Sequence, residues 1–168
     1  MPHTDPKRFS VSALEIYARP GFAERAIALQ DDFGFDVNCL LFCLWAGIVA
    51  GKRLTVAECA ATIALTGDWS RQVAGNLREA RRALKEGMDG GIWRPRPELY
   101  EAIKAVELSA EKIELEWLDR FGSDWPDGGP GDRDVAVANL HRHAEAAGAE
   151  IDAMLTARFA ELVDSANP

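Results

Sequence analysis

Three carboxylates near the most apolar stretch of the chain could hold a metal ion. Asp31 and Asp32 are adjacent, and Asp36 follows four residues later. Carboxylate oxygens are ligands that Mg²⁺ prefers in proteins. Asp36, however, directly precedes an apolar run, where the start of a helix calls for a capping side chain. We therefore predict that Asp36 caps a helix, that the other two carboxylates are solvated, and that the protein holds no metal.

After Asp36, Asn38 is the only strongly polar side chain of the apolar run. A buried amide must find hydrogen-bond partners. Tyr17, Arg19 and Gln30 could supply them from the two helices that we expect before it. One interpretation is a polar network that fixes how these helices dock. The other is a small-ligand pocket near Asn38, in which Arg19 binds an anionic group.

Pairs of histidines and cysteines also occur, but their spacing or surroundings argue against a reactive site. His141 and His143 would lie about 200° apart on a helix, so they cannot hold one ion together. Cys39 and Cys43 share a helical face, but apolar surroundings raise the pKa of a thiol and make it inert. Because the chain also lacks a glycine-rich phosphate loop and a nucleophile elbow, we predict no catalysis and no cofactor.

Two predicted helices over about residues 55–86 could form a helix-turn-helix, with its turn at Leu65-Thr66-Gly67. The second of them carries five basic and three acidic side chains, and several basic ones fall near one face, where they could meet phosphates. The basic side chains of this face are Arg71, Arg78, Arg82 and Lys85. The pattern therefore allows a DNA-binding regulator as an alternative function.

Two observations disfavour that alternative. Ile63 stands where the motif favours a small residue, and a net charge of −8 is not typical of a protein that binds nucleic acid. The other interpretation is an amphipathic helix whose arginines pair with glutamates on its solvated face.

These candidates depend on a helix at about residues 37–51 that is apolar on all sides. Such a helix must be enclosed by protein or by lipid. It is too short for a bilayer, which needs about 20 residues. We therefore predict an all-α fold, a single bundle of six or seven helices around this buried central helix. No strand pattern appears in the sequence.

The C-terminal part of the chain predicts two long helices separated by a linker. An apolar stripe at steps of three and four residues runs along the first of them, which begins at about Pro97 and ends at Phe121. The stripe consists of Leu99, Ile103, Val106, Ala110, Ile113, Trp117 and Phe121. We expect a bundle domain at 9–121, a Gly/Pro-rich linker at 122–131, and one helical arm at 132–165. The arm docks either on this body or on a second chain.

Several motifs that occur in order within about residues 9–120 resemble those of a small proteobacterial family of uncharacterised, all-helical, cytoplasmic proteins. The motifs are Tyr17-Ala-Arg-Pro-Gly21, Leu29-Gln30, Gly34-Phe-Asp-Val-Asn38, Leu40-Leu-Phe42 and Leu44-Trp45. The resemblance implies an all-helical fold and no known reaction. The positions that it singles out are Tyr17, Arg19, Gln30, Asp36, Asn38 and Trp45.

The function that we predict is that of a non-catalytic interaction or accessory protein, which binds a protein partner or itself through its long helices. Trp93, Trp117 and Trp125 are candidate contact residues, because tryptophan is enriched at interface hot spots. The C-terminal arm is the expected self-association element of a possible homodimer. The sequence shows no signal-peptide pattern and no membrane span, which favours the cytoplasm and excludes the membrane as a partner.

Overall fold

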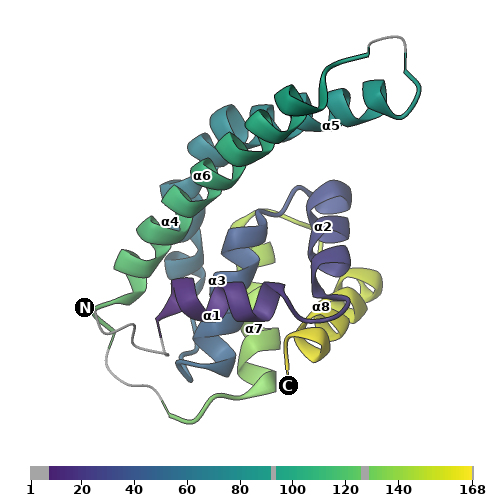
Figure 1. Ribbon diagram of the computed structural model, residues 1–168. Coiled ribbons are helices and arrows are strands. Elements are labelled where there is room, and N and C mark those ends of the chain that lie inside the picture. Colours follow the sequence, from purple (N-terminus) through teal and green to yellow (C-terminus); the bar gives the residue numbers. More distant parts are fainter. Residues whose placement is uncertain (1–7, 92–93, 126–128, 168) are drawn as a thin grey trace.

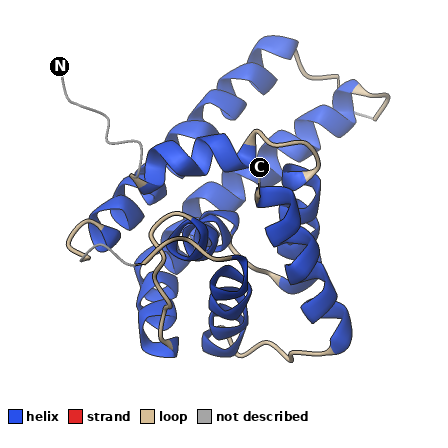
Figure 2. Ribbon diagram, turned by 90° about the horizontal axis from the view of Figure 1, so that it is seen from below, coloured by secondary structure: helices blue, strands red, loops and turns tan. Residues whose placement is uncertain are grey.

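The computed structural model describes residues 8–91, 94–125 and 129–167 of the chain, and all of their regular structure is helical. This confirms the predicted all-α class, and Figure 2 shows only helices and loops. The helices are α1 (Phe9–Tyr17), α2 (Phe22–Phe33), α3 (Val37–Ile48), α4 (Val56–Trp69), α5 (Asn76–Met88), α6 (Pro97–Gly122), α7 (Arg133–Ala146) and α8 (Ala153–Ala166), with a π-helical segment, η1 (Ser70–Gly75), between α4 and α5.

The helices form a lobe and a hairpin that extends beyond it (Figure 1). The lobe contains α1, α2, α3, α7 and α8, and α4 packs against α7. The hairpin consists of α5 and α6, which lie antiparallel and project past the lobe, so that the far half of the hairpin has no third helix beside it. The base of α6 contacts α1, α3 and α4, and Arg82 of α5 forms an ion pair with Asp31 of α2.

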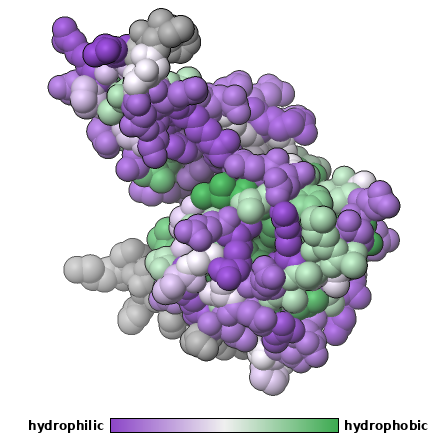
Figure 3. Space-filling model, turned by 90° about the vertical axis from the view of Figure 1, so that its right-hand side faces the viewer, coloured by the Kyte–Doolittle hydropathy of each residue, from purple (hydrophilic) through white to green (hydrophobic). Residues whose placement is uncertain are grey.

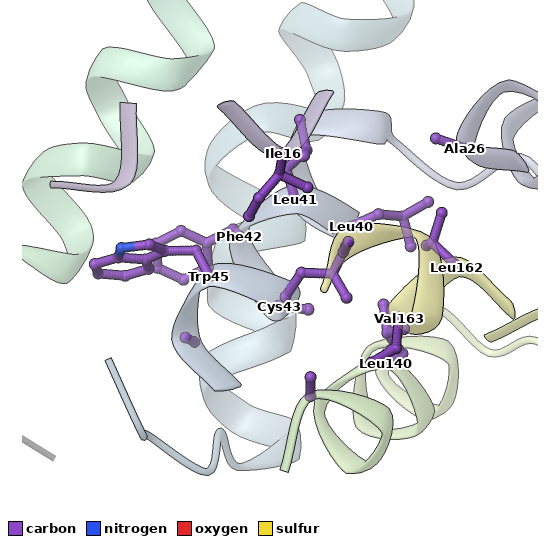
Figure 4. Close-up of a cluster of buried hydrophobic side chains, with 14 of the residues drawn as sticks. Ile16, Ala26, Leu40, Leu41, Phe42, Cys43, Trp45, Leu140, Leu162 and Val163 are labelled. Atoms are coloured by element: carbon purple, nitrogen blue, oxygen red, sulfur yellow. The ribbon is translucent and has the colours of Figure 1, made fainter. Parts of the chain in front are cut away.

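α3 is the buried central helix that the sequence predicts. Asp36 caps it by accepting a hydrogen bond from the Cys39 backbone N–H at 3.0 Å. Every residue from Cys39 to Gly47 is buried. Figure 4 shows these side chains pointing to different neighbours, with Leu41 beside Ile16 and Cys43 toward α7. Each large aliphatic side chain buried in this way contributes about 1.5–3 kcal/mol to stability. The helix ends at Ile48, three residues before the end predicted from the sequence.

The prediction of one long C-terminal helix is wrong, because the chain turns between α7 and α8. Gly148 adopts a left-handed conformation with φ +71°, and the Asp152 side chain then caps α8 by accepting from the Leu155 N–H at 2.7 Å. Small residues let α7 approach α3 closely: a Cβ added to Gly47 would lie 2.5 Å from the Ala136 backbone. Both helices contribute to the same hydrophobic core as α1 to α3, so they do not project from the lobe as an arm.

The predicted turn at Leu65-Thr66-Gly67 is also wrong, because these residues are helical. The chain runs from Val56 to Met88 through η1 without a turn, and the helix-turn-helix therefore does not form. Gly75 fits the wider π-helical turn, since a Cβ there would lie 2.9 Å from the Ser70 carbonyl oxygen. At the start of η1, the Trp69 indole N–H donates to the Ala110 carbonyl at 3.0 Å and fixes α4 against α6.

Candidate functional site

α6 buries some of its carboxylates and leaves several of its aliphatic side chains exposed. Glu107 and Glu114 are only 4% and 1% exposed. By contrast, Leu99 and Val106 are 49% and 52% exposed, although the sequence places them in a packing stripe. An amphipathic helix normally buries its apolar face. Buried carboxylates are costly unless they are paired and hydrogen-bonded, so their partners define the first candidate site.

Two arginines of α5 hold the carboxylates in the middle of the hairpin. Arg81 binds both oxygens of Glu107, donating from Nε to one and from Nη2 to the other at 3.3 Å. Arg78 donates from Nη2 to Glu111 at 3.1 Å, and its Nε lies 3.4 Å from Glu107. Burial raises the pKa of Glu111, and Arg78 opposes this shift. This arginine ladder joins α5 to α6, because charge-assisted hydrogen bonds of this kind are among the stronger ones in proteins.

The base of the hairpin meets α3 at a second group of polar side chains. The Asn38 amide donates from Nδ2 to Glu114 Oε2 at 2.6 Å, while Glu114 Oε1 has no partner in the part of the chain that the structure describes. Asp36, besides capping α3, accepts a hydrogen bond from the Ser70 hydroxyl of η1. We call Asp36, Asn38, Ser70 and Glu114 the polar junction. It links the lobe, the π-helical segment and the hairpin.

Glu114 is protonated at neutral pH. Burial and the nearby charge of Asp36 raise its pKa to about 8, while the Asn38 hydrogen bond opposes the shift. The polar junction therefore includes a group that titrates above neutral pH, and its hydrogen bonds position the hairpin on the lobe.

The structure places the predicted partners of Asn38 elsewhere. Arg19 donates to the Ala166 carbonyl at the end of α8, so its guanidinium binds there instead of at Asn38. Tyr17 packs its ring against Phe22, with centroids 6.1 Å apart, and burial raises the pKa of its hydroxyl. Gln30 is half-buried on α2. The amide nitrogen of Asn38 therefore takes Glu114 as its partner, which the sequence analysis missed.

Two of the three tryptophans predicted as contact residues pack within their own chain. Trp45 stacks on Trp125 with centroids 5.8 Å apart, and the Lys52 ammonium lies 4.7 Å from the Trp125 ring. Trp117 meets Trp69 edge to face at 5.5 Å, so neither Trp117 nor Trp125 is a fully exposed contact residue. Trp93 lies outside the described residues.

Three of the four basic side chains proposed to meet phosphates are paired with carboxylates of the same chain. Arg71 pairs with Asp68, Arg78 with two glutamates of α6, and Arg82 with Asp31 at 3.1 Å. Lys85 is exposed near the end of α5. The Arg71–Asp68 pair lies within one helical run, as the second interpretation expects, whereas Arg78 and Arg82 pair with carboxylates of α6 and α2.

A shallow depression of about 550 Å³ lies along α7, away from the polar junction. Its lining residues are Asp134, Val137, Ala138, His141, Arg142, Glu145 and Ile151. The His141 ring is held by the Val137 carbonyl at 2.9 Å and by the Thr156 hydroxyl at 3.3 Å, which leaves neither nitrogen free for a metal. Among the described residues, no three His, Cys, Asp or Glu side chains gather closely enough to hold a metal ion.

A buried amide on α7 was not anticipated from the sequence. Asn139 donates to the Cys43 and Lys52 carbonyls, at 3.2 and 2.9 Å, and accepts from the Leu54 N–H at 2.8 Å. It fastens the loop after α3 to α7. An isolated asparagine in a helical pattern carries no signal of this role, because its partners are backbone groups that are distant in sequence.

Comparisons with known proteins give one match. A family model described as a protein of unknown function (DUF2390) matches residues 11–118. No curated protein and no solved structure matches the chain. The matched region contains all four residues of the polar junction and nearly all of the hairpin, whereas α7 and α8 lie beyond it. In the helices of the described residues, no segment has both the length and the apolar character needed to cross a membrane.

Proposed function

We propose that this chain, which belongs to the DUF2390 family of proteins of unknown function, is a non-catalytic binding protein. It captures a protein partner on its projecting hairpin. The observation that carries the proposal is the exposure of Leu99 and Val106 on α6, whose inward face is occupied by carboxylates. Exposed apolar side chains gathered on one surface mark interaction sites more often than isolated ones do.

Five uncharged residues form a continuous strip along one side of α6. Leu99, Ala102, Val106, Ser109 and Ile113 are spaced by three and four residues in turn, so they fall within about 80° of the helix circumference. The first four are exposed, Ile113 is half-buried, and none of the five is charged. We call this set the α6 strip. Its spacing is that of a helix–helix packing seam.

The contacts below the α6 strip support a binding role, because they hold the strip in place before any partner arrives. The arginine ladder holds α6 on α5, and the indole of Trp69 anchors it to α4 through the Ala110 carbonyl. A surface that is already ordered loses less conformational entropy on binding. Figure 3 shows the hairpin standing above the lobe, with hydrophobic side chains at the surface where the two meet.

A photo-crosslinking amino acid placed at Val106 in the native cell tests the proposal. Leu108 provides a matched control, because it is an aliphatic residue of α6 with 49% exposure that lies about 200° around the helix. We expect a covalent adduct with another protein from position 106 and none from position 108. The absence of an adduct from 106, or equal adducts from both positions, would contradict the proposal.

We expect this interaction to take place in the cytoplasm of a bacterium. The three cysteines are free and buried, and free thiols are typical of reducing compartments. The DNA-binding alternative has less support, because its predicted turn is helical and most of its basic face is already paired.

A further inference from the structure

We infer that the segment which docks on the α6 strip is an amphipathic helix of a partner protein with basic side chains along one edge. The inference rests on the proposed binding function and specifies the chemistry of the partner. It follows from two independent features of α6, the spacing of its apolar residues and the charges that border them.

The spacing of the α6 strip fits a helix better than an extended segment. Residues that alternate in steps of three and four form the seam into which a second helix inserts its side chains. Ala102 and Ser109 are small and alternate along α6 with the larger Leu99, Val106 and Ile113. A partner helix with an apolar face would place its own large side chains over these small residues.

One border of the α6 strip is acidic. Glu98, Glu101 and Glu116 are exposed along it, and Lys112 is the cation among them. None of the ion pairs formed by the described residues includes these three glutamates. The arginines of α5, in contrast, are paired with carboxylates inside the chain. The unpaired carboxylates therefore favour a partner that brings cations to this edge.

The same charges disfavour a second copy of this chain as the occupant. In an antiparallel two-fold pair of α6 helices, the acidic edge of one copy would face the acidic edge of the other. Like charges placed opposite each other in an interface are unfavourable, and the whole chain carries a net charge of −8. A basic helix from a different protein meets neither difficulty.

Binding of two designed peptides to the full chain tests the inference. Both peptides are three-heptad helices with an apolar seam; one carries lysines along one edge, and the other carries glutamates at the same positions. Fluorescence anisotropy should show that the lysine peptide binds about tenfold more tightly at low salt. Added salt should reduce this preference. Equal binding of the two peptides would overturn the inference.

Three variants locate the binding and its charge dependence. Val106→Lys should abolish binding of the lysine peptide, whereas Leu108→Lys, on another side of α6, should leave it unchanged. The triple change Glu98→Lys, Glu101→Lys and Glu116→Lys should reverse the preference between the peptides. Binding that survives Val106→Lys, or a preference that survives the triple change, would overturn the inference.

The adducts from position 106 separate this inference from the proposed function. A basic amphipathic helix at the crosslinked site supports both. An adduct with an acidic or non-helical segment of another protein overturns only the inference, and the proposed function stands. An adduct with a second copy of the chain alone overturns both, as does the absence of any adduct.

Discussion

The amide of Asn38 donates to the carboxyl of Glu114 at 2.6 Å, and this hydrogen bond joins the central helix of the lobe to the helix that projects from it. Glu114 stays neutral at pH 7 because burial and the charge of Asp36 raise its pKa. We therefore expect the attachment of the hairpin to the lobe to depend on the protonation of Glu114 as well as on packing.

Raising the pH should destabilise the protein through Glu114. Its pKa is about 8 in the folded state and near 4.5 when unfolded, so the folded state binds the extra proton between these values. That stability is present at low pH and is lost as the pH rises through 8. We expect a loss of about 2 kcal/mol between pH 6.5 and pH 9. Urea denaturation at both pH values should show a smaller loss of unfolding free energy for Glu114→Gln than for the unmodified protein. Equal losses would show that the titration of Glu114 is not the cause.

The arginine ladder should contribute far more stability than an exposed ion pair of the same type. Arg81→Met removes the main partner of Glu107, which is nearly buried, so we expect a cost of about 2–3 kcal/mol. Arg71→Met removes the pair with Asp68, in which both side chains are exposed, and should cost under about 0.5 kcal/mol. Chemical denaturation measures both. Similar costs would show that the arginine ladder contributes no more stability than an exposed ion pair.

The parts of the lobe that the sequence predicts correctly are those whose sequence pattern lies within one short segment of the chain. The α3 sequence is apolar on every side, which by itself demands burial, and Asp36 at its start is a cap that the structure confirms. The capping box of Thr55 and Glu58 at the start of α4 is another signal of this local kind. In these elements the residues and the backbone groups that they satisfy are neighbours in sequence.

The hairpin was not predictable, because its pattern depends on what lies beside it. The stripe of α6 is apolar, but the far half of this helix has no lobe against it, and Leu99 and Val106 remain exposed. Glu107 and Glu114 are buried only because Arg81 and Asn38 meet them from other helices. Sequence spacing within one helix contains no information about such partners.

Acid should destabilise the protein through His143. Burial lowers the pKa of this ring from 6.5 to about 4, and the charge of Asp36 partly opposes the shift. Because the folded state holds the ring neutral, the stability that this provides is present above pH 6.5 and is lost as the pH falls toward 4. We expect a loss of about 3 kcal/mol over this interval. Between pH 4.5 and 6.5, the stability that His143 loses as the pH falls is offset by the stability that Glu114 gains.

Replacing the His143 ring separates its effect on stability from that of Glu114. His143→Gln should lose less stability between pH 6.5 and pH 4 than the unmodified protein. Thermal unfolding followed by circular dichroism between pH 4 and pH 7 gives the comparison. An identical acid dependence in His143→Gln would rule out the buried ring as the cause.

Two glycine substitutions test the features of the fold that differ most from the sequence-based prediction. Gly47→Ala would place a Cβ 2.5 Å from the Ala136 backbone, where neither helix can move without opening the core, so we expect a loss of about 1–3 kcal/mol. Gly67→Ala meets no atom closer than 3.8 Å and lies inside α4, so it should stabilise the protein by about 0.5–1 kcal/mol. If residues 65–67 formed the turn of a helix-turn-helix instead, with Gly67 at positive φ, the alanine would be strained and the sign would be reversed. The sign of the Gly67→Ala effect in urea denaturation therefore decides between a continuous helix and a turn.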